Sequence, residues 1–402
     1  MEKRNFIKSI LFFLCMYTIT YSQGKSEIPS YLKEYSSVYA KQPKQAALQW
    51  FKDAGFGMFV HFSPASQLAG GTDEWMRLDN WFQQQKDFES MSRDARKNHL
   101  IAKMTQVSSN VERLIYSFNP VSFNADSIAD LAVKAGMRYI TFTTQHVIGK
   151  MYMYDTSLSK WNSKNLLGRD FVQELSIACE KRGLGLFLYV TPPNDNLQAE
   201  LKIMLRELLS NYGSIAGIWF DGIGECYRRP NEFMEVGRLY DYIRQIQPQC
   251  LISFKTGYTG DEDFIAPEWN QVKFSENKIP LFTIDVPADN GISLYKEKKL
   301  RTVLRITPEG LVYKQQNFRK VWEEELSKKP VELSNTLLEN MQWFNVKNGV
   351  HKDRTKILGE YRYAKDCHAN YILNVALEGD GSIHPSDYQI LEGLKNEILS
   401  IK

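Results

Sequence analysis

The stretch from residue 169 to residue 221 decides the fold and reads RDFVQELSIACEKRGLGLFLYVTPPNDNLQAELKIMLRELLSNYGSIAGIWFD. Arg169 to Arg182 carries apolar residues at helical spacing and is followed by a glycine. Gly185 to Val190 (GLFLYV) is an apolar run of strand length. A second amphipathic helix is expected over Leu197 to Tyr212, and Ile215 to Asp221 (IAGIWFD) is strand again. Strands without polar alternation, joined by helices of this length, indicate a parallel sheet covered on both faces.

The same alternation of strands and helices extends in both directions along the chain. Phe56 to Phe62 (FGMFVHF) and Tyr139 to Thr144 (YITFTT) are strands, and the helix between them opens at Asn124. Leu251 to Lys255 and Tyr371 to Val375 are later strands. Five helix-strand units and a late strand favour a closed barrel over an open sheet, and the first strand is not followed by a nucleotide-binding motif. We therefore predict an α/β fold, a (β/α)8-like TIM barrel, regular or irregular, in a single domain.

The first 22 residues have the layout of a secretory signal peptide. Three basic residues lie within the first eight, and Ile10 to Tyr21 is an apolar run too short to span a membrane. We predict cleavage after Ser22, a secreted or periplasmic location and no stable membrane insertion; a lipid anchor at Cys15 is the less favoured alternative. Residues 23–44 are expected to form a polar lead-in. Residues 45–402 are expected to form the barrel, with an insertion at about 270–330.

The composition argues against two classes of protein. The net charge is +3, with both signs interspersed and no run of Lys or Arg, which argues against a nucleic-acid partner. Four cysteines remain after cleavage, widely spaced and without a CxxC pair, so neither a disulfide framework nor a zinc site is indicated. The sequence leaves the oligomeric state open.

Polar residues stand where the predicted strands end. In a parallel barrel the carboxyl ends of the strands meet at one rim and carry the functional groups. His61, His146, Tyr189 and Asp221 lie at or just after such ends, and the fifth unit ends at Lys255. We therefore expect these side chains to lie close together.

The acidic residues of this rim indicate glycoside hydrolysis. That reaction through a covalent intermediate needs one ionised carboxylate and a second carboxyl that starts protonated. Asp221 follows the strand that contains Trp219, and the loop after the fifth unit carries Asp261, Asp263 and Glu268. An acid beside an aromatic ring at a strand end fits such a site.

Each of these residues also has a structural interpretation. Asp221 is then a turn residue, His61 a hydrogen-bonded core histidine, and Tyr189 and Trp219 core aromatics. A metal centre built from His61, His146 and Asp221 has suitable residue types, but no HxH or HExxH spacing supports it.

Segments distributed over residues 45–400 resemble the α-L-fucosidases of glycoside hydrolase family 29. They are WFKDAGFGMFVHF (Trp50 to Phe62), DEWM (Asp73 to Met76), the stretch ending at His146, RDFVQELSIACEKRGLGLFLYV, NYGSIAGIWFDG (Asn211 to Gly222), DEDFIAPE (Asp261 to Glu268), PVELSNTLLENMQWF and NYILNVALEGDGSIHPSD. The most specific match is NYGSIAGIWFDG. The resemblance covers the catalytic domain only.

The resemblance implies a role for each matching residue. Asp221 corresponds to the family nucleophile and Glu268 to the general acid/base of some members, with Glu74 or Glu332 as alternatives for the acid. Residues implied to bind the sugar are His61, Glu74, Trp75, His146, Tyr189, Trp219, Lys255 and Trp343. No metal or organic cofactor is implied, since two carboxylates suffice for the chemistry.

The chain departs from the family pattern at several places, among them the Trp-Gly that follows the first histidine, which is Phe62-Ser63 here. The family's His-His-Asp-Gly-Phe run is replaced by His146-Val147-Ile148-Gly149-Lys150, and Lys255 stands in place of an arginine, without its planar bidentate contact. We expect an exo-acting retaining hydrolase that cuts a terminal α-L-fucose or a related sugar from an oligosaccharide or polysaccharide fragment. The alternatives are a non-catalytic sugar-binding homologue and a glycosidase with shifted specificity.

An exo-acting retaining hydrolase implies two features of the geometry. The insertion at about 270–330 is expected to pack beside the mouth of the site and narrow the access to a chain end. For a retaining enzyme, the carboxyl groups of Asp221 and Glu268 are expected to lie about 5–6 Å apart.

Overall fold

The computed structural model describes residues 27–71, 112–146, 151–191, 197–221, 236–255, 261–269, 272–274, 280–282, 301–307, 310–316 and 328–401. The proposed signal peptide, Glu74, Trp75 and most of the expected insertion lie outside these residues. What the sequence indicates for those segments therefore remains a prediction.

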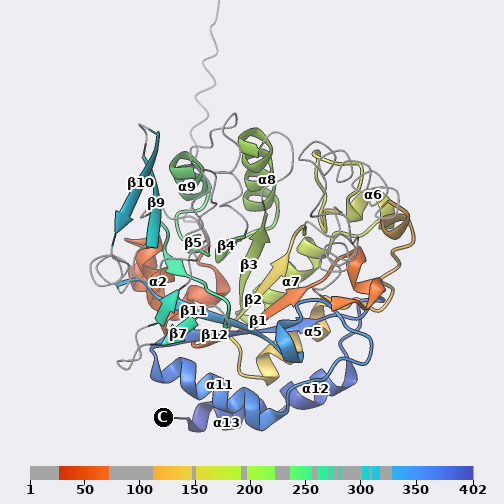
Figure 1. Cartoon of the computed structure of the whole chain (residues 1–402). Coiled ribbons are helices and arrows are strands. Elements are labelled where there is room, and N and C mark those ends of the chain that lie inside the picture. Colours follow the sequence, from red (N-terminus) through yellow and green to blue (C-terminus); the bar gives the residue numbers. More distant parts are fainter. Residues whose placement is uncertain are drawn as a thin grey trace, which may run out of the picture.

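Eight parallel strands close into a barrel (Figure 1). They are β1 (Phe56–His61), β2 (Tyr139–Thr143), β3 (Gly185–Val190), β4 (Gly217–Phe220), β5 (Leu251–Phe254), β6 (Phe264–Ile265), β11 (Val331–Thr336) and β12 (Ala369–Ala376). Strands β1 to β6 are neighbours in chain order, β6 pairs with β11, and β12 closes the barrel on β1. This confirms the predicted α/β barrel and brings the carboxyl ends of the strands to one rim.

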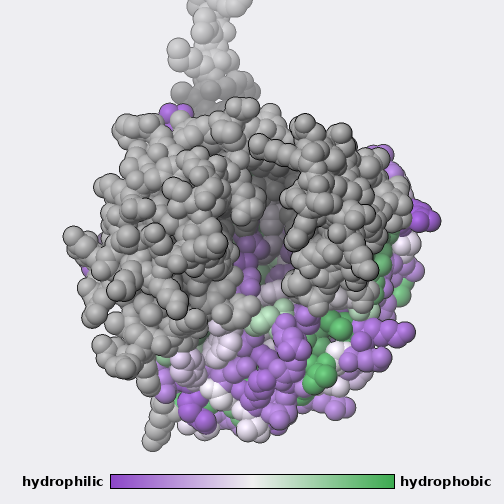
Figure 2. All heavy atoms as spheres, in the orientation of Figure 1, coloured by the Kyte–Doolittle hydropathy of each residue, from purple (hydrophilic) through white to green (hydrophobic). Residues whose placement is uncertain are grey.

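The helices that follow the strands cover the outside of the barrel. They are α5 (Ala125–Lys134), α7 (Phe171–Arg182), α8 (Leu197–Asn211), α9 (Val236–Ile246) and α11 (Arg354–Asp366). The short helix α6 (Ser163–Leu167) precedes α7, α12 (Pro385–Leu391) packs on α5, and α13 (Leu394–Ser400) packs on α5 and α11. Asp170 begins α7 by accepting a hydrogen bond from the Gln173 N–H, and Gly183 ends it with a φ of 69°. The surface around α11, α12 and α13, at the bottom of the view, is mostly hydrophilic, with small hydrophobic patches (Figure 2).

Aromatic rings fill the barrel, and strand glycines make room for them. A Cβ added to Gly57 in β1 would come within 2.3 Å of the Tyr139 ring, and one added to Gly217 in β4 would come within 2.3 Å of the Phe187 ring. Since buried rings in a packed core cannot move aside freely, these two positions require glycine.

Packing against the barrel begins well before residue 45. Residues 30–54 form η1 (Ser30–Tyr35), α1 (Ser36–Tyr39) and α2 (Pro43–Ala54). Tyr31 is buried with its ring centroid 4.5 Å from that of Trp50, and Phe51 lies 4.6 Å from Phe264 inside the barrel. The expected polar lead-in, residues 23–44, therefore includes short helices. Their polar residues face outwards, and their aromatic residues pack into the core.

Two barrel strands are not recognisable from periodicity. β6 has only two residues, and β11 reads VELSNT, with polar residues on a strand that is buried throughout. In the region of the expected insertion, β7 (Val272–Phe274) pairs with β8 (Pro280–Phe282), and β9 (Arg301–Thr307) pairs with β10 (Gly310–Gln316), both antiparallel. Strand β9 lies beside α9 (Figure 1). Within the described ranges, no helix has the length and apolar character needed to cross a bilayer.

Candidate active site

Two carboxylates at the rim share one ammonium group. Asp221 follows β4 directly, Lys255 follows β5, and Glu268 lies three residues beyond β6, so three neighbouring strands bring them together. Lys255 Nζ is 2.9 Å from Asp221 Oδ1 and 2.7 Å from Glu268 Oε1. These two oxygens therefore cannot lie farther apart than the sum of those distances.

The loop that carries Glu268 is anchored to the barrel. Its backbone forms a parallel bridge with Ser334 of β11. The Ser334 N–H and hydroxyl both donate to the Pro267 carbonyl, each at 3.1 Å. Glu268 is thus held at the rim by β11, although it follows a strand of only two residues.

Asp221 and Lys255 are both held in their charged forms. Burial by itself raises the pKa of Asp221, but the Lys255 ammonium and the Tyr189 hydroxyl hold that pKa below its usual value. The Tyr189 O–H donates to Asp221 Oδ2 at 2.8 Å. Burial by itself lowers the pKa of Lys255, but Asp221 and Glu268 raise it above its usual value. An ionised carboxylate is the form that a nucleophile requires.

His61 at the end of β1 is neutral and has a defined tautomer. Burial lowers its pKa well below the usual 6.5. Asn374 Nδ2 donates to the Trp343 carbonyl at 2.8 Å, which directs Asn374 Oδ1 towards His61 Nδ1 at 2.7 Å. Because an amide oxygen only accepts, Nδ1 carries the proton and Nε2 is the acceptor. His61 therefore offers a hydrogen-bond acceptor for a hydroxyl group.

His146 is also neutral. Burial lowers the pKa of this side chain to about 4. Its ring lies parallel to that of Tyr189, with centroids 5.7 Å apart, and Tyr189 stacks in turn on Trp219 at 5.7 Å. The three rings form one continuous aromatic wall beside Asp221.

These side chains surround a cavity of about 170 Å³. The cavity is lined by Phe59, His61, His146, Tyr189, Trp219, Asp221, Lys255, Glu268 and Trp343. Trp343 comes from the rim loop between β11 and α11, and its ring lies 4.9 Å from that of His61. Aromatic faces, neutral imidazoles and two carboxylates with one ammonium group thus line one small pocket.

The structure describes Asp221, Glu268 and six of the eight predicted sugar-binding residues, and all of these line this one pocket. Phe59 was missed, although it lies two residues before His61 and therefore on the same face of β1. Asn374 was also missed, and no signal in the sequence alone singles it out. Glu74 and Trp75 lie outside the described residues.

Glu332, one of the alternatives for the acid, does not line the pocket. Its side chain is fully buried inside the barrel. It accepts hydrogen bonds from Trp219 Nε1 at 2.8 Å and from the Tyr139 hydroxyl at 2.6 Å. Burial raises its pKa to about 7. Glu332 lies beneath the indole of Trp219 and has no access to a substrate oxygen in the pocket.

Comparison with known proteins links the chain and its fold to one family. The family profile described as Alpha-L-fucosidase matches residues 25–286, more than half of the chain. Alpha-L-fucosidase 1 of Arabidopsis thaliana is 29% identical over 169 residues, which cover 37% of this chain and 32% of that protein. Tissue alpha-L-fucosidase of Bos taurus is 28% identical over 194 residues, which cover 44% and 39%. The chain thus matches less than half the length of these two relatives.

Known structures show the same barrel. The alpha-L-fucosidase AlfC from Lactobacillus casei, in complex with its alpha-L-fucose product, has a TM-score of 0.57 at 23% identity, covering 88% of this chain and 98% of that one. Alpha-L-fucosidase isoenzyme 1 from Paenibacillus thiaminolyticus has a TM-score of 0.58 at 20% identity, covering 89% and 76%.

Proposed function

Because the chain belongs to the α-L-fucosidase family, glycoside hydrolase family 29, we propose that it is an exported, exo-acting and retaining glycoside hydrolase. Its substrate would be an oligosaccharide or polysaccharide fragment that ends in α-L-fucose or a related sugar. The observation that carries the proposal is the pair of pocket carboxylates, Asp221 and Glu268, joined by Lys255.

The proposed reaction has two displacements. In the first, an Asp221 carboxylate oxygen attacks the anomeric carbon while Glu268, in its protonated form, donates its proton to the glycosidic oxygen, so the C–O bond breaks and the aglycone leaves as an alcohol. In the second, Glu268 takes a proton from water, whose oxygen displaces Asp221 from the sugar. Two inversions return the original anomeric configuration.

The separation of the carboxylates supports the retaining course. The bound that Lys255 sets on the two oxygens is the sum of 2.9 and 2.7 Å. That bound lies below the roughly 6.5–9.5 Å of inverting enzymes and close to the roughly 5–5.5 Å of retaining ones. A water molecule that attacks from the opposite face would need the larger gap.

The pocket dimensions support the exo-acting part of the proposal. Pockets for drug-sized ligands usually measure about 300–1,000 Å³, whereas the cavity here measures about 170 Å³. A cavity of this size suits one sugar ring rather than several. His61 Nε2 would accept from a sugar hydroxyl, and the aromatic wall would pack on the apolar face of the ring.

Export rests on the amino-terminal sequence alone. Its basic start, short apolar run and polar residues before Gln23 support a cleaved signal peptide. Amino-terminal sequencing of the mature protein from its native host tests this part separately from the activity.

The activity is tested with aryl glycosides of several L- and D-sugars. The aryl α-L-fucoside is expected to be cleaved, with the β-configured fucoside untouched. Preferred cleavage of another sugar would support the shifted-specificity alternative. Sugar binding without turnover of any substrate would support the non-catalytic one and overturn the proposal.

Azide rescue assigns the two carboxylates. Asp221→Ala should lose about 10⁴-fold or more in kcat and give, with azide, a glycosyl azide of inverted configuration. Glu268→Ala should give an azide of retained configuration and lose most activity on substrates with poor leaving groups. Near-normal turnover of Glu268→Ala on such a substrate would remove Glu268 from the role of acid.

A further inference from the structure

A second cluster of chemically capable side chains lies outside the sugar pocket. His351, His384 and Asp387 each offer one potential ligand atom, and these atoms all lie within 4.8 Å of one another. The two imidazole rings are nearly parallel, with centroids 4.2 Å apart. His351 Nδ1 lies 2.5 Å from Asp387 Oδ1. In the part of the chain that the structure describes, this is the one group with such a convergence of ligand atoms.

We propose that His351, His384 and Asp387 bind a divalent transition-metal ion of the Zn²⁺ class. Two imidazole nitrogens and one carboxylate oxygen are a ligand set that Zn²⁺ accepts, with water in the fourth position. Ca²⁺ and Mg²⁺ prefer oxygen ligands, so a site with two imidazole nitrogens should bind them weakly. With metal–ligand distances of about 2.0–2.2 Å, ligand atoms around a tetrahedral ion lie roughly 3.3–3.6 Å apart. His351 Nδ1 and Asp387 Oδ1 would therefore separate from 2.5 Å when an ion replaces their hydrogen bond, while ligand atoms that lie up to 4.8 Å apart would draw closer.

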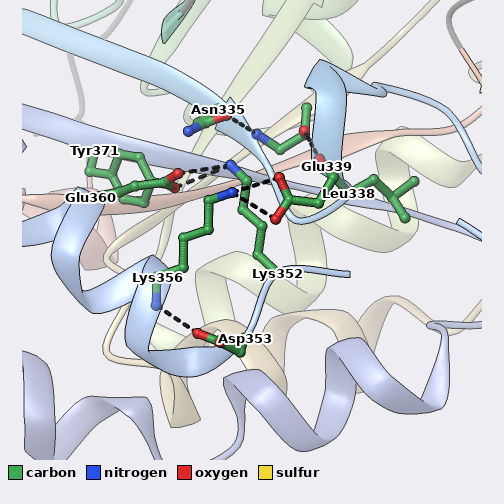
Figure 3. A network of polar contacts seen from close by, with 9 residues as sticks. Asn335, Leu338, Glu339, Lys352, Asp353, Lys356, Glu360 and Tyr371 are labelled. Atoms are coloured by element: carbon green, nitrogen blue, oxygen red, sulfur yellow. Dashed lines mark hydrogen bonds and ion pairs between the residues drawn. The ribbon is translucent and has the colours of Figure 1, made fainter. Parts of the chain in front are cut away.

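The backbone at His351 is fixed on both sides by its neighbours. The Glu339 N–H donates to the Val350 carbonyl at 2.8 Å, and the Lys352 N–H donates to the Leu337 carbonyl at 2.8 Å. The side chain of Lys352 is buried and pairs with Glu360, 3.1 Å away (Figure 3).

Further contacts hold this part of the rim loop against the barrel. Glu360 also accepts from the hydroxyl of Tyr371 on β12, and Lys356 pairs with Glu339 at 2.6 Å (Figure 3). A ligand that projects from such a backbone is already positioned, so little ordering would be needed when an ion binds.

The other two ligands come from the start of α12. His384 is its N-cap residue, and its Nδ1 accepts from the Ser386 N–H at 3.2 Å. Asp387 follows three residues later, a spacing that places both side chains on one side of the first turn. Asp387 is buried while His351 and His384 are half-buried, which gives an ion a path from solvent.

A bound ion would tie two parts of the rim together. His351 ends the loop that carries Trp343, and His384 and Asp387 belong to the segment after β12, which closes the barrel on β1. Because the ion would bind the folded chain and not the unfolded one, it would stabilise the fold as its concentration rises. It would act on the wall of the sugar pocket without touching the sugar.

Zinc titration of the full chain without an affinity tag tests the site. After treatment with a chelator and its removal, the wild-type protein is titrated with ZnCl2 in a calorimeter and melted with and without ZnCl2. We expect one Zn²⁺ ion per chain and a higher melting temperature. CaCl2 and MgCl2 at the same concentration should produce neither effect.

Matched variants assign the zinc ion to the cluster. His384→Asn removes the imidazole but keeps a good N-cap residue, and it should weaken zinc binding by at least about tenfold. Asp387→Asn should weaken it similarly. His368→Asn is the control, because His368 is exposed, lies at the opposite end of β12 from the segment that carries His384 and Asp387, and has a φ of 54°, which asparagine tolerates.

Two outcomes would overturn the proposal. The wild-type chain fails to bind Zn²⁺, a result that does not depend on any variant folding. Alternatively, His384→Asn binds Zn²⁺ with unchanged affinity and stoichiometry, which would assign the ion to other side chains. In that case the cluster is only a His351–Asp387 hydrogen-bonded pair beside a helix cap.

Discussion

Asp221 and Glu332 are two carboxylates of the same barrel in opposite environments. Asp221 stands at the rim, 2.9 Å from the Lys255 ammonium. Glu332 stands inside the barrel at the start of β11 and accepts hydrogen bonds from two neutral donors, the Trp219 indole and the Tyr139 hydroxyl. The pKa of Asp221 is lowered, whereas that of Glu332 is raised to about 7.

The difference shows what decides the charge of a buried acid in this protein. Burial opposes ionisation at both residues, and hydrogen bonds from neutral groups favour it at both. Only the full countercharge of Lys255 is large enough to reverse the effect of burial. Asp221 is therefore ionised because the Lys255 ammonium contacts it. The charge of Glu332, deeper in the barrel, changes with pH near neutrality.

Removal of the countercharge should have the largest effect. Lys255→Met leaves Asp221 and Glu268 close together without a cation, so the pKa of Asp221 should rise. The Asp221–Lys255 contact stabilises the fold above the usual pKa of Asp221, and this stabilisation is lost as pH falls through the lowered value. We expect kcat/KM to fall about 10²–10³-fold and the acidic limb of the pH–rate profile to move to higher pH.

Lys255→Arg is the control for this change, since it keeps the charge and changes the shape. Its acidic limb should stay close to that of the wild type, even if turnover falls. A Lys255→Met profile that overlays the wild-type profile would show that the ammonium does not govern Asp221.

Glu332→Gln should have an intermediate effect that depends on pH. The folded pKa of about 7 exceeds the ordinary 4.5, so the folded state binds more protons between these values. Wild-type stability should therefore fall as pH rises from 4.5 to 7. The variant has no titrating group at this position, so its stability should not fall in this way. Its free energy of unfolding relative to that of the wild type should therefore rise by up to about 3 kcal/mol between pH 4.5 and pH 7. Urea unfolding at pH 4.5 and pH 8 measures the difference, and an equal difference at both pH values would contradict it.

Tyr189→Phe should have the smallest effect. It removes one neutral hydrogen bond, at 2.8 Å, from Asp221 Oδ2. We expect about a tenfold loss of kcat/KM and a loss of stability of about 1–2 kcal/mol. Tyr212→Phe is a matched control, because the Tyr212 hydroxyl donates to Asp170 at the same distance away from the pocket. If both variants change turnover equally, the Tyr189 hydroxyl has no particular role at Asp221.

The strands that the sequence predicts and those that it misses differ in a physical way. β1 to β5 are apolar throughout or nearly so, because each is covered by helices outside and by aromatic rings inside. β11 carries Glu332, Ser334 and Asn335, whose burial is tolerated because neighbouring strands and loops supply partners for the first two. The hydropathy pattern of β11 contains no information about hydrogen-bond partners on other strands and loops. It therefore does not predict a buried strand.

For the site, the chain order placed Asp221, Tyr189, His61 and Lys255 at strand ends, because side chains at the ends of parallel strands share one rim whatever lies between them. Tertiary structure alone decided that one ammonium lies between Asp221 and Glu268, that Asn374 sets the tautomer of His61, and that Glu332 lies beneath Trp219. Strand ends follow from hydrophobic periodicity, which is local. Ionisation and tautomer depend on partners distant in sequence, and only closure of the barrel brings these within a few ångströms.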